Sequence, residues 1–173
     1  MNELIVVDKK DNIISFELKD RCHDGDGILH RAFSVFVFND KKQLLIQQRS
    51  RLKRLWPLYW SNTCCSHPRQ NEGYKEAAER RLREEIGISC KLKYLFKFRY
   101  RATYYDIGSE NEICAVLIGR SNDSIILNKE EIANYKWISL KELAEDISQN
   151  PEIYTPWFKL EFRKLISSYR KEL

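Results

Sequence analysis

One apolar run constrains the fold of this chain more than any other feature. Residues 33–38 form an aromatic and β-branched stretch, which the polar residues 39–42 separate from a second apolar run at 44–46. Such residues are enriched in strands, and a short polar segment between two apolar runs is typical of a turn. The pattern therefore predicts a hairpin in the centre of the protein.

Further strands are predicted on both sides of this hairpin. The segment 94–100 alternates aromatic with basic residues, which indicates a strand with one face in water. Apolar or alternating runs predict the others at residues 4–7, 13–18, 113–118 and 135–138.

Three helices can be predicted from their end signals. The first covers about Tyr74 to Ile86 and is stopped by Gly87. The second begins after Ser139, with Glu142 three residues later as a capping box, and the third begins at Pro156. Strands and helices together predict an α+β fold.

Length and composition bound the class of protein. The chain has 173 residues, of which 43% are hydrophobic and 32% charged, as expected for one globular domain. No apolar run approaches the ~20 residues that cross a bilayer, and the first residues lack the basic segment of a signal peptide. Five cysteines, an odd number, suit a reduced compartment better than a disulfide framework. We expect a soluble cytoplasmic protein.

The net charge of +5 leaves two explanations open. A solvated basic surface is the more frequent one, and a polyanionic ligand is the other. The chain has no long Lys/Arg block and no nucleic-acid-binding motif, so a small phosphate ester is favoured over nucleic acid.

The chain has only three histidines, His23, His30 and His67. A single histidine is more often structural than a ligand, but two of these flank the glycine-bearing segment 24–27. Glu110 and Glu112 point the same way if their segment is extended. Three imidazoles and two carboxylates would suit Mn²⁺ or Mg²⁺, or Zn²⁺ in a less usual geometry. Segment 24–27 lacks the later ligands of a calcium loop.

The end of the first helix, Glu84-Glu85-Ile86-Gly87-Ile88, resembles the closing part of the Nudix box, a helix whose glutamates hold Mg²⁺ against a diphosphate. Glu72 and Arg80 also fall at box positions. Ser66, however, replaces the opening glycine, and Arg81 replaces a glutamate. Arg81 and Glu85 share a helix face, so they form either an ordinary ion pair or a site where the cation attracts phosphate oxygens.

Five motifs, in the right order and spread over nearly the whole chain, resemble the type I isopentenyl-diphosphate isomerases. The motifs are Trp-Ser-Asn-Thr-Cys-Cys-Ser-His-Pro at 60–68, His-Arg-Ala-Phe-Ser at 30–34, Phe-Arg-Tyr-Arg-Ala at 98–102, Glu-Asn-Glu at 110–112 and Thr-Pro-Trp at 155–157.

This resemblance implies a fold, a set of roles and the cofactors. The implied fold is a Nudix-like α/β/α sandwich, one domain over residues 1–173 with extra terminal elements. A first divalent metal and a Mg²⁺ that arrives with the substrate are implied. The implied roles are catalysis for Cys65, Glu112, Tyr100 and Trp157; the first metal site for His23, His30, His67, Glu110 and Glu112; Mg²⁺ binding for Glu85; and diphosphate binding for Lys19, Arg49, Lys53 and Arg81.

The implied reaction converts isopentenyl to dimethylallyl diphosphate by adding a proton at one carbon and removing one from another. Glu112 and Cys65 would serve as the acid–base pair on opposite faces, with the direction of their roles open. Adjacent residues of an extended segment point to opposite sides, so only Cys65 or Cys64 can face the substrate, and the spacing to His67 favours Cys65. The competing function is a Nudix pyrophosphohydrolase, which would need the glutamate missing at position 81. We expect a small diphosphate as partner, no nucleic acid, no membrane span, and a monomer or weak dimer.

Overall fold

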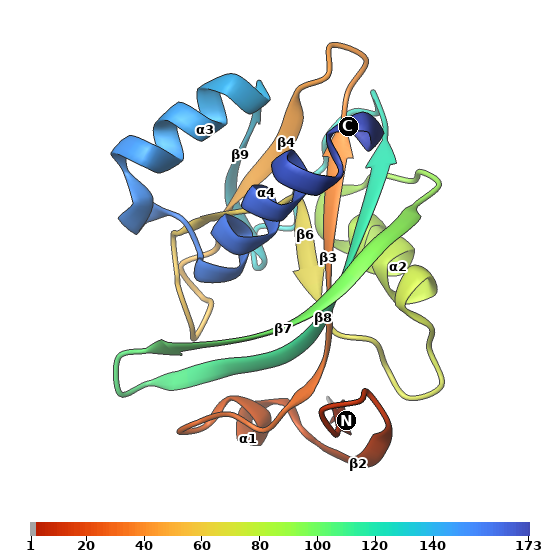
Figure 1. Cartoon of the computed structure of the whole chain (residues 1–173), viewed down its shortest axis with the longest axis vertical. Helices are drawn as coiled ribbons and strands as arrows, with labels where there is room; N and C mark the ends of the chain where they lie inside the picture. The colour runs from red at the N-terminus through yellow and green to blue at the C-terminus, as the bar shows by residue number, and fades with distance from the viewer. Residues whose placement is uncertain (1–2) are drawn as a thin grey trace.

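The computed structural model describes residues 3–173, and all its strands join one nine-stranded sheet (Figure 1). The elements are, in chain order, β1 (Glu3–Val7), β2 (Ile13–Leu18), α1 (Lys19–His23), β3 (His30–Phe38), β4 (Leu44–Arg49), β5 (Trp60–Ser61), β6 (Cys64–Ser66), α2 (Tyr74–Ile86), β7 (Lys93–Tyr104), β8 (Gly108–Arg120), β9 (Ile132–Ile138), α3 (Leu140–Gln149) and α4 (Pro156–Ser168), with 3-10 turns at Pro151–Ile153 and Arg170–Glu172.

Strand β3 is the centre of this sheet. Along one edge it pairs in parallel with β8, in a register that runs from His30 opposite Glu112 to Phe38 opposite Arg120. Its other edge is shared in succession by β1, β6 and β4. Strand β6, which carries Cys65, is therefore held against the middle of β3.

The predicted central hairpin is wrong beyond its turn. Both strands and the turn exist, but β3 and β4 pair only at Phe38 and Leu44. Strand β4 then runs along β9, from Leu44 opposite Ile138 to Arg49 opposite Ile132. The physical reason is competition for one edge, because β6 supplies the hydrogen bonds that the middle of β3 would otherwise give to β4.

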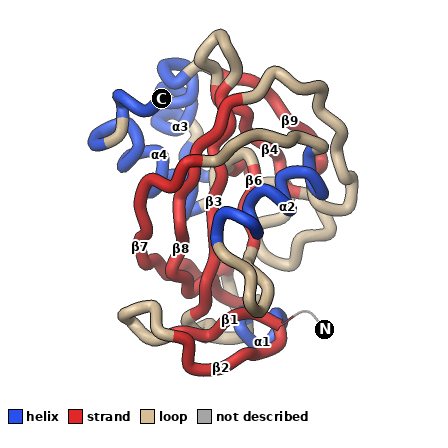
Figure 2. The backbone as a smooth tube through the Cα atoms, turned by 90° about the vertical axis from the view of Figure 1, so that its right-hand side faces the viewer, coloured by secondary structure: helices blue, strands red, loops and turns tan. Residues whose placement is uncertain are grey.

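Helices cover both faces of the sheet, which confirms the α/β/α arrangement (Figures 1 and 2). Successive side chains of a strand point to opposite faces. Phe33 and Val35 of β3 accordingly pack with Leu82 of α2, whereas Phe36 packs with Phe158 of α4. Each such buried side chain stabilises the fold by about 1.5–3 kcal/mol relative to exposure. β3 is therefore apolar on both faces because it is covered on both.

The helix boundaries follow the signals in the sequence. α2 covers the predicted residues, and Gly87 beyond it takes a left-handed φ of 78° that glycine adopts without strain. Ser139 and Glu142 form the predicted capping box of α3, and Pro156 is the first residue of α4. The five-residue α1, which presents Lys19 and His23, was not predicted, because one turn is too short to show periodicity.

None of the helices described between residues 3 and 173 has both the length and the apolarity needed to cross a membrane.

Candidate functional site

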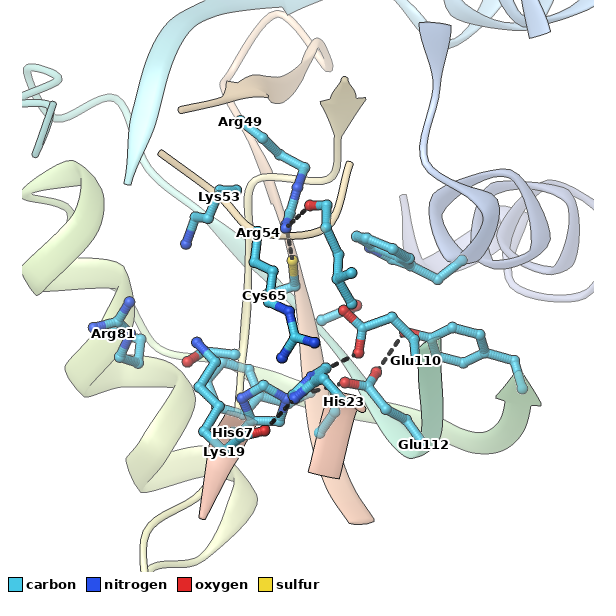
Figure 3. Close-up of a pocket in the computed structure, with 17 residues that line it drawn as sticks. Lys19, His23, Arg49, Lys53, Arg54, Cys65, His67, Arg81, Glu110 and Glu112 are labelled. Atoms are coloured by element: carbon cyan, nitrogen blue, oxygen red, sulfur yellow. Dashed lines mark hydrogen bonds and ion pairs between the residues drawn. The ribbon is translucent and has the colours of Figure 1, made fainter. Parts of the chain in front are cut away.

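A pocket opens beside the middle of β3, between the α2 side of the molecule and the start of α4 (Figure 3). Elements far apart in the sequence contribute to it: α1, β3, β4 and the segment after it, β6 and the segment after it, α2, β7, β8 and α4. It is lined by almost all the residues implied for catalysis and binding, namely Lys19, His23, Arg49, Lys53, Cys65, His67, Arg81, Tyr100, Glu110, Glu112 and Trp157.

The five side chains expected at the first metal site converge at one end of the pocket. One ligand atom from each of His23, His30, His67, Glu110 and Glu112 lies within 4.8 Å of all the others. The imidazole centroids are 4.9 to 5.5 Å apart. Strand pairing explains part of this geometry, because the parallel register sets His30 directly opposite Glu112.

Hydrogen bonds fix the orientation of two of these imidazoles. Nδ1 of His23 bonds the carbonyl of Lys19 at 2.7 Å, and Nδ1 of His30 bonds that of Ile28 at 2.7 Å. If Nδ1 donates in each case, the neutral ring keeps a lone pair on Nε2, which is the usual state of a metal-bound histidine. Among the described residues, the buried Nε2 of His30 has no hydrogen-bond partner. An orphaned nitrogen inside a cluster of imidazoles and carboxylates fits a cation site.

Charges within the cluster set its protonation. Burial lowers the pKa of His67, and the neighbouring His30 and His23 lower it further, so this ring is neutral. Burial also acts to lower the pKa of His23, but Glu110, whose Oε2 lies 2.9 Å from its Nε2, outweighs burial and raises it. Burial acts to raise the pKa of Glu112, but His30, whose Nε2 lies 3.4 Å from Oε1, and the hydrogen bond from Tyr100 lower it overall.

Glu112 links the cluster of imidazoles and carboxylates to the hydroxyl of Tyr100. The hydroxyl of Tyr100 donates to Oε2 of Glu112 at 2.5 Å, while Oε1 lies 3.0 Å from Nε2 of His67. Tyr100 stands opposite Glu112 in the β7–β8 ladder, so both side chains leave the same face of the sheet. Burial and the Glu112 charge raise the pKa of Tyr100, which keeps its hydroxyl protonated.

The two adjacent cysteines of β6 point to opposite faces. Cys64 is fully buried in the apolar cluster under α2, whereas Cys65 lines the pocket on the α4 side. Burial raises the pKa of Cys65 to about 12 even though the charge of Arg49 opposes the shift. Cys65 therefore rests as a neutral thiol that faces the pocket.

Lys53 and Arg81 approach the pocket from one side and share a carboxylate that the sequence analysis missed (Figure 3). Glu131 forms ion pairs with both, and the distance to Nη2 of Arg81 is 2.8 Å. Lys19 adds a third cation, whose pKa is lowered by burial and by the charge of Lys53. Glu131 comes from the loop before β9, and no spacing in the sequence connects it to the helix that carries Arg81.

Arg49, expected to bind the diphosphate, has several partners within the protein. Its Nε and Nη2 donate to the carbonyls of Trp56 and Leu55 at 3.0 and 2.8 Å. Nη1 is 3.9 Å from the sulfur of Cys65, and the guanidinium lies 5.2 Å from the ring centroid of Trp157. Most of its donors are thus already occupied, and it braces the thiol and the aromatic wall of the pocket.

Glu85, expected to bind Mg²⁺, is buried and paired with an arginine in the structure. Its side chain is 1% exposed, and Oε1 lies 2.5 Å from Nη2 of Arg81. It is not among the residues that line the pocket. The ion pair left open by the sequence is thus formed, and Arg81 separates Glu85 from the pocket.

The remaining Nudix-box positions have a structural role. Arg80 holds Glu72 through two bonds of 2.7 Å and also contacts Glu84 at 3.2 Å. This network ties the loop before α2 to the helix. Arg54, another pocket residue that the sequence analysis missed, bonds Asp24 at 2.6 Å and so anchors the segment between α1 and β3.

Comparison with known proteins gives concordant results. A model of the NUDIX domain matches residues 28–158. The chain is 39% identical over 175 residues to isopentenyl-diphosphate Delta-isomerase 1 of Photorhabdus laumondii subsp. laumondii, with 100% of this chain and 99% of that protein covered. It is 44% identical over 156 residues to isopentenyl-diphosphate Delta-isomerase 2 of the same organism, covering 90% and 88%. The solved structure of DR0079 from Deinococcus radiodurans superposes with a TM-score of 0.77 at 22% identity, covering 94% and 98%, which shows a shared fold.

Proposed function

The chain belongs to the isopentenyl-diphosphate Delta-isomerases of the NUDIX domain family, and from this membership we propose that it interconverts isopentenyl and dimethylallyl diphosphate. The observation that carries the proposal is the content of one pocket. A thiol, Cys65, and a hydrogen-bonded Tyr100–Glu112 pair both line it, between cationic side chains and the indole of Trp157. Diphosphate hydrolysis uses neither the thiol nor the aromatic wall.

Of the two proposed acid–base groups, Cys65 and Glu112, one carries a proton and the other does not. Moving the double bond requires a proton at one carbon and its loss from another. In the substrate-free protein the Cys65 thiol is protonated, while the lowered pKa of Glu112 keeps its carboxyl ionised. Because the reaction is reversible, each group donates in one direction and accepts in the other. Tyr100 stabilises the ionised form of Glu112 through its hydroxyl.

Trp157 stabilises the positive charge that develops on the hydrocarbon. Its ring is buried at the first turn of α4 and lines the pocket. An indole face contributes ~2 kcal/mol or more to a desolvated cation. Water would quench such a cation, so the apolar surround of Trp56 and Tyr100 protects it.

Lys19, Lys53 and Arg81 are the groups we assign to the diphosphate. Charge-assisted contacts to phosphate oxygens are strong, and Arg81 can make two of them. In the substrate-free protein, Glu131 holds Lys53 and Arg81 by ion pairs, so the diphosphate would replace one carboxylate as their partner. Arg49 acts with them only indirectly, through Cys65 and Trp157.

His23, His30, His67, Glu110 and Glu112 would hold a divalent cation, Mn²⁺ or Mg²⁺, or Zn²⁺ in a less usual geometry. Such a cation would supply positive charge beside Glu112. A second cation, Mg²⁺ brought by the substrate, would use Glu85, which requires Arg81 to release the carboxylate. All five cysteines are free thiols, and we place the reaction in the cytoplasm, in a monomer or weak dimer.

Product analysis tests the function directly. The metal-loaded protein is incubated with isopentenyl diphosphate, and the products are separated. We expect an acid-labile allylic diphosphate and no release of inorganic phosphate or diphosphate. Release of either anion would instead identify a pyrophosphohydrolase, which Arg81 in place of a carboxylate disfavours. Dialysis against a chelator, followed by metal analysis and return of one metal at a time, identifies the cation.

A further inference from the structure

Behind the pocket lies a buried carboxyl group that forms no ion pair with any residue between 3 and 173. Glu161 of α4 is 0% exposed. Its Oε1 accepts a hydrogen bond from the thiol of Cys114 at 3.5 Å, and that thiol lies 3.5 Å from the hydroxyl of Ser34, which also acts on the carboxyl. Within the described part of the chain, Oε2 has no hydrogen-bond partner. A buried carboxyl is normally paired with a cation, and Glu161 has neutral hydrogen-bonding partners instead.

These neutral surroundings determine its protonation. Burial raises the pKa of Glu161 to about 8, although hydrogen bonds from Ser34 and Cys114 oppose the shift and the charge of Glu112 adds a little. These three groups, on β3 and β8, are the ones that act on it. At neutral pH the carboxyl is mostly protonated and can donate a hydrogen bond as well as accept one.

The partners of Glu161 form the floor of the pocket. Ser34 lines the pocket and stands opposite Cys65 in the β3–β6 ladder. Directly opposite residues of an antiparallel pair project from the same face with Cβ atoms about 5 Å apart, so the Ser34 hydroxyl lies beside the Cys65 thiol. Trp157, one turn before Glu161 on α4, shares its helix face and forms the wall.

We propose that Glu161 is a positioning residue of the isomerase, whose carboxyl fixes the Ser34 hydroxyl beside Cys65 at the floor of the pocket. This inference rests on the proposed function and extends it to a residue that touches no substrate. The neutral carboxyl keeps the floor polar but uncharged. An ionised Glu161 would draw the Ser34 proton towards itself and would repel the charge of Glu112.

The position of Glu161 predicts which kinetic constant changes. Among the described residues, its partners are Ser34 and Cys114, and it has no contact with Lys19, Lys53 or Arg81. A change at Glu161 should therefore lower kcat and leave KM near its wild-type value. It should also move the alkaline limb of the kcat profile, which a purely structural residue would not do.

Three variants separate these possibilities in the metal-loaded enzyme. Glu161→Gln keeps the shape and the hydrogen bonds but cannot ionise, so we expect near-wild-type kcat at pH 7 and loss of the decline in kcat above about pH 8. Glu161→Leu fills the space without hydrogen bonds, and we expect kcat to fall on the order of ten-fold at constant KM. Leu165→Ala, one turn further along α4 and fully in the core, is the matched control for lost stability.

An infrared measurement adds a readout that does not depend on turnover. Spectra recorded at about pH 6 and about pH 10 should show a protonated carboxyl band that disappears at high pH and is absent from Glu161→Gln. The proposal is overturned if Glu161→Leu retains wild-type kcat and pH profile, if Glu161→Gln is as impaired as Glu161→Leu, or if Leu165→Ala lowers kcat equally. An inactive wild-type enzyme would refute the proposed function itself, while the infrared band would still report whether Glu161 is a neutral acid.

Discussion

The adjacent thiols of β6 allow a test in which two nearly identical substitutions have opposite consequences. Cys64→Ala removes one sulfur atom from the apolar cluster under α2, where Cys64 is fully buried. The cost should resemble that of deleting one buried methyl group, on the order of 1 kcal/mol. For a chain of this length, that lowers the melting temperature by about 2–4 °C. Turnover should be largely unchanged.

Cys65→Ala should behave in the opposite way. It removes a group that transfers a proton, which typically costs 10²-fold or more in kcat. KM should change little, because Arg49 keeps its two backbone carbonyl partners and the cations at the other end are untouched. Steady-state kinetics of both variants, with thermal unfolding as the control for folding, measure these effects. An active Cys65→Ala enzyme beside a folded but inactive Cys64→Ala enzyme would refute the assignment.

Substitutions at three further positions test other parts of the site. Arg81→Glu should raise KM at least ten-fold, and more than Arg81→Gln does, because it places a carboxylate against the diphosphate. Equal KM values for the two variants and the wild type would rule out a contact between Arg81 and the diphosphate. Tyr100→Phe removes the 2.5 Å bond to Glu112 and should lower kcat by about 10- to 100-fold, since a hydrogen bond to a charged group contributes ~1.5–3 kcal/mol; unchanged kcat would show that Tyr100 only packs. Burial opposes ionisation of Glu131, but Lys53 and Arg81 hold its pKa at about 2. Its ion pairs therefore stabilise the fold fully above about pH 4.5, and this stabilisation is lost as the pH falls towards 2. Allowing for solvent screening, the loss in the free energy of unfolding is up to about 2 kcal/mol. The free energy of unfolding of Glu131→Gln should therefore depend less steeply on pH in the acid range than that of the wild type. Equal slopes for the two proteins would contradict the ion pairing.

The sequence predicted the elements well where local signals exist. The boundaries of α2 followed from Gly87, and the capping box at Ser139 and Glu142 marked the start of α3. The predicted pairing of β3 with β4 was confirmed only beside the turn, because strand partners depend on competition between distant segments, which no local pattern records. The segment that competes for the edge of β3, β6, has only three residues.

In the candidate site, too, some features could be predicted from the sequence and others could not. Convergence of the histidines and carboxylates could be anticipated from their number and from the family resemblance. The contacts of Arg49 could not be predicted from the sequence, because its partners are backbone carbonyls whose positions depend on the loop at Trp56. Glu131 and Glu161 were missed for a related reason. Each becomes notable only through its partners, a pair of cations for Glu131 and the neutral side chains of Ser34 and Cys114 for Glu161.

The parallel pairing of β3 with β8 has a consequence for the order of folding. It sets His30 beside Glu112, although most of the other strands and the whole of α2 lie between them in the chain. Parallel contacts of such long range carry a large loop-closure cost and form late. Before that closure the imidazoles and carboxylates are not brought together, so a cation finds few of its ligands in place in the folding transition state. Metal binding to this chain should therefore act on the unfolding rate, lengthening the lifetime of the native state while leaving the rate of folding nearly unchanged.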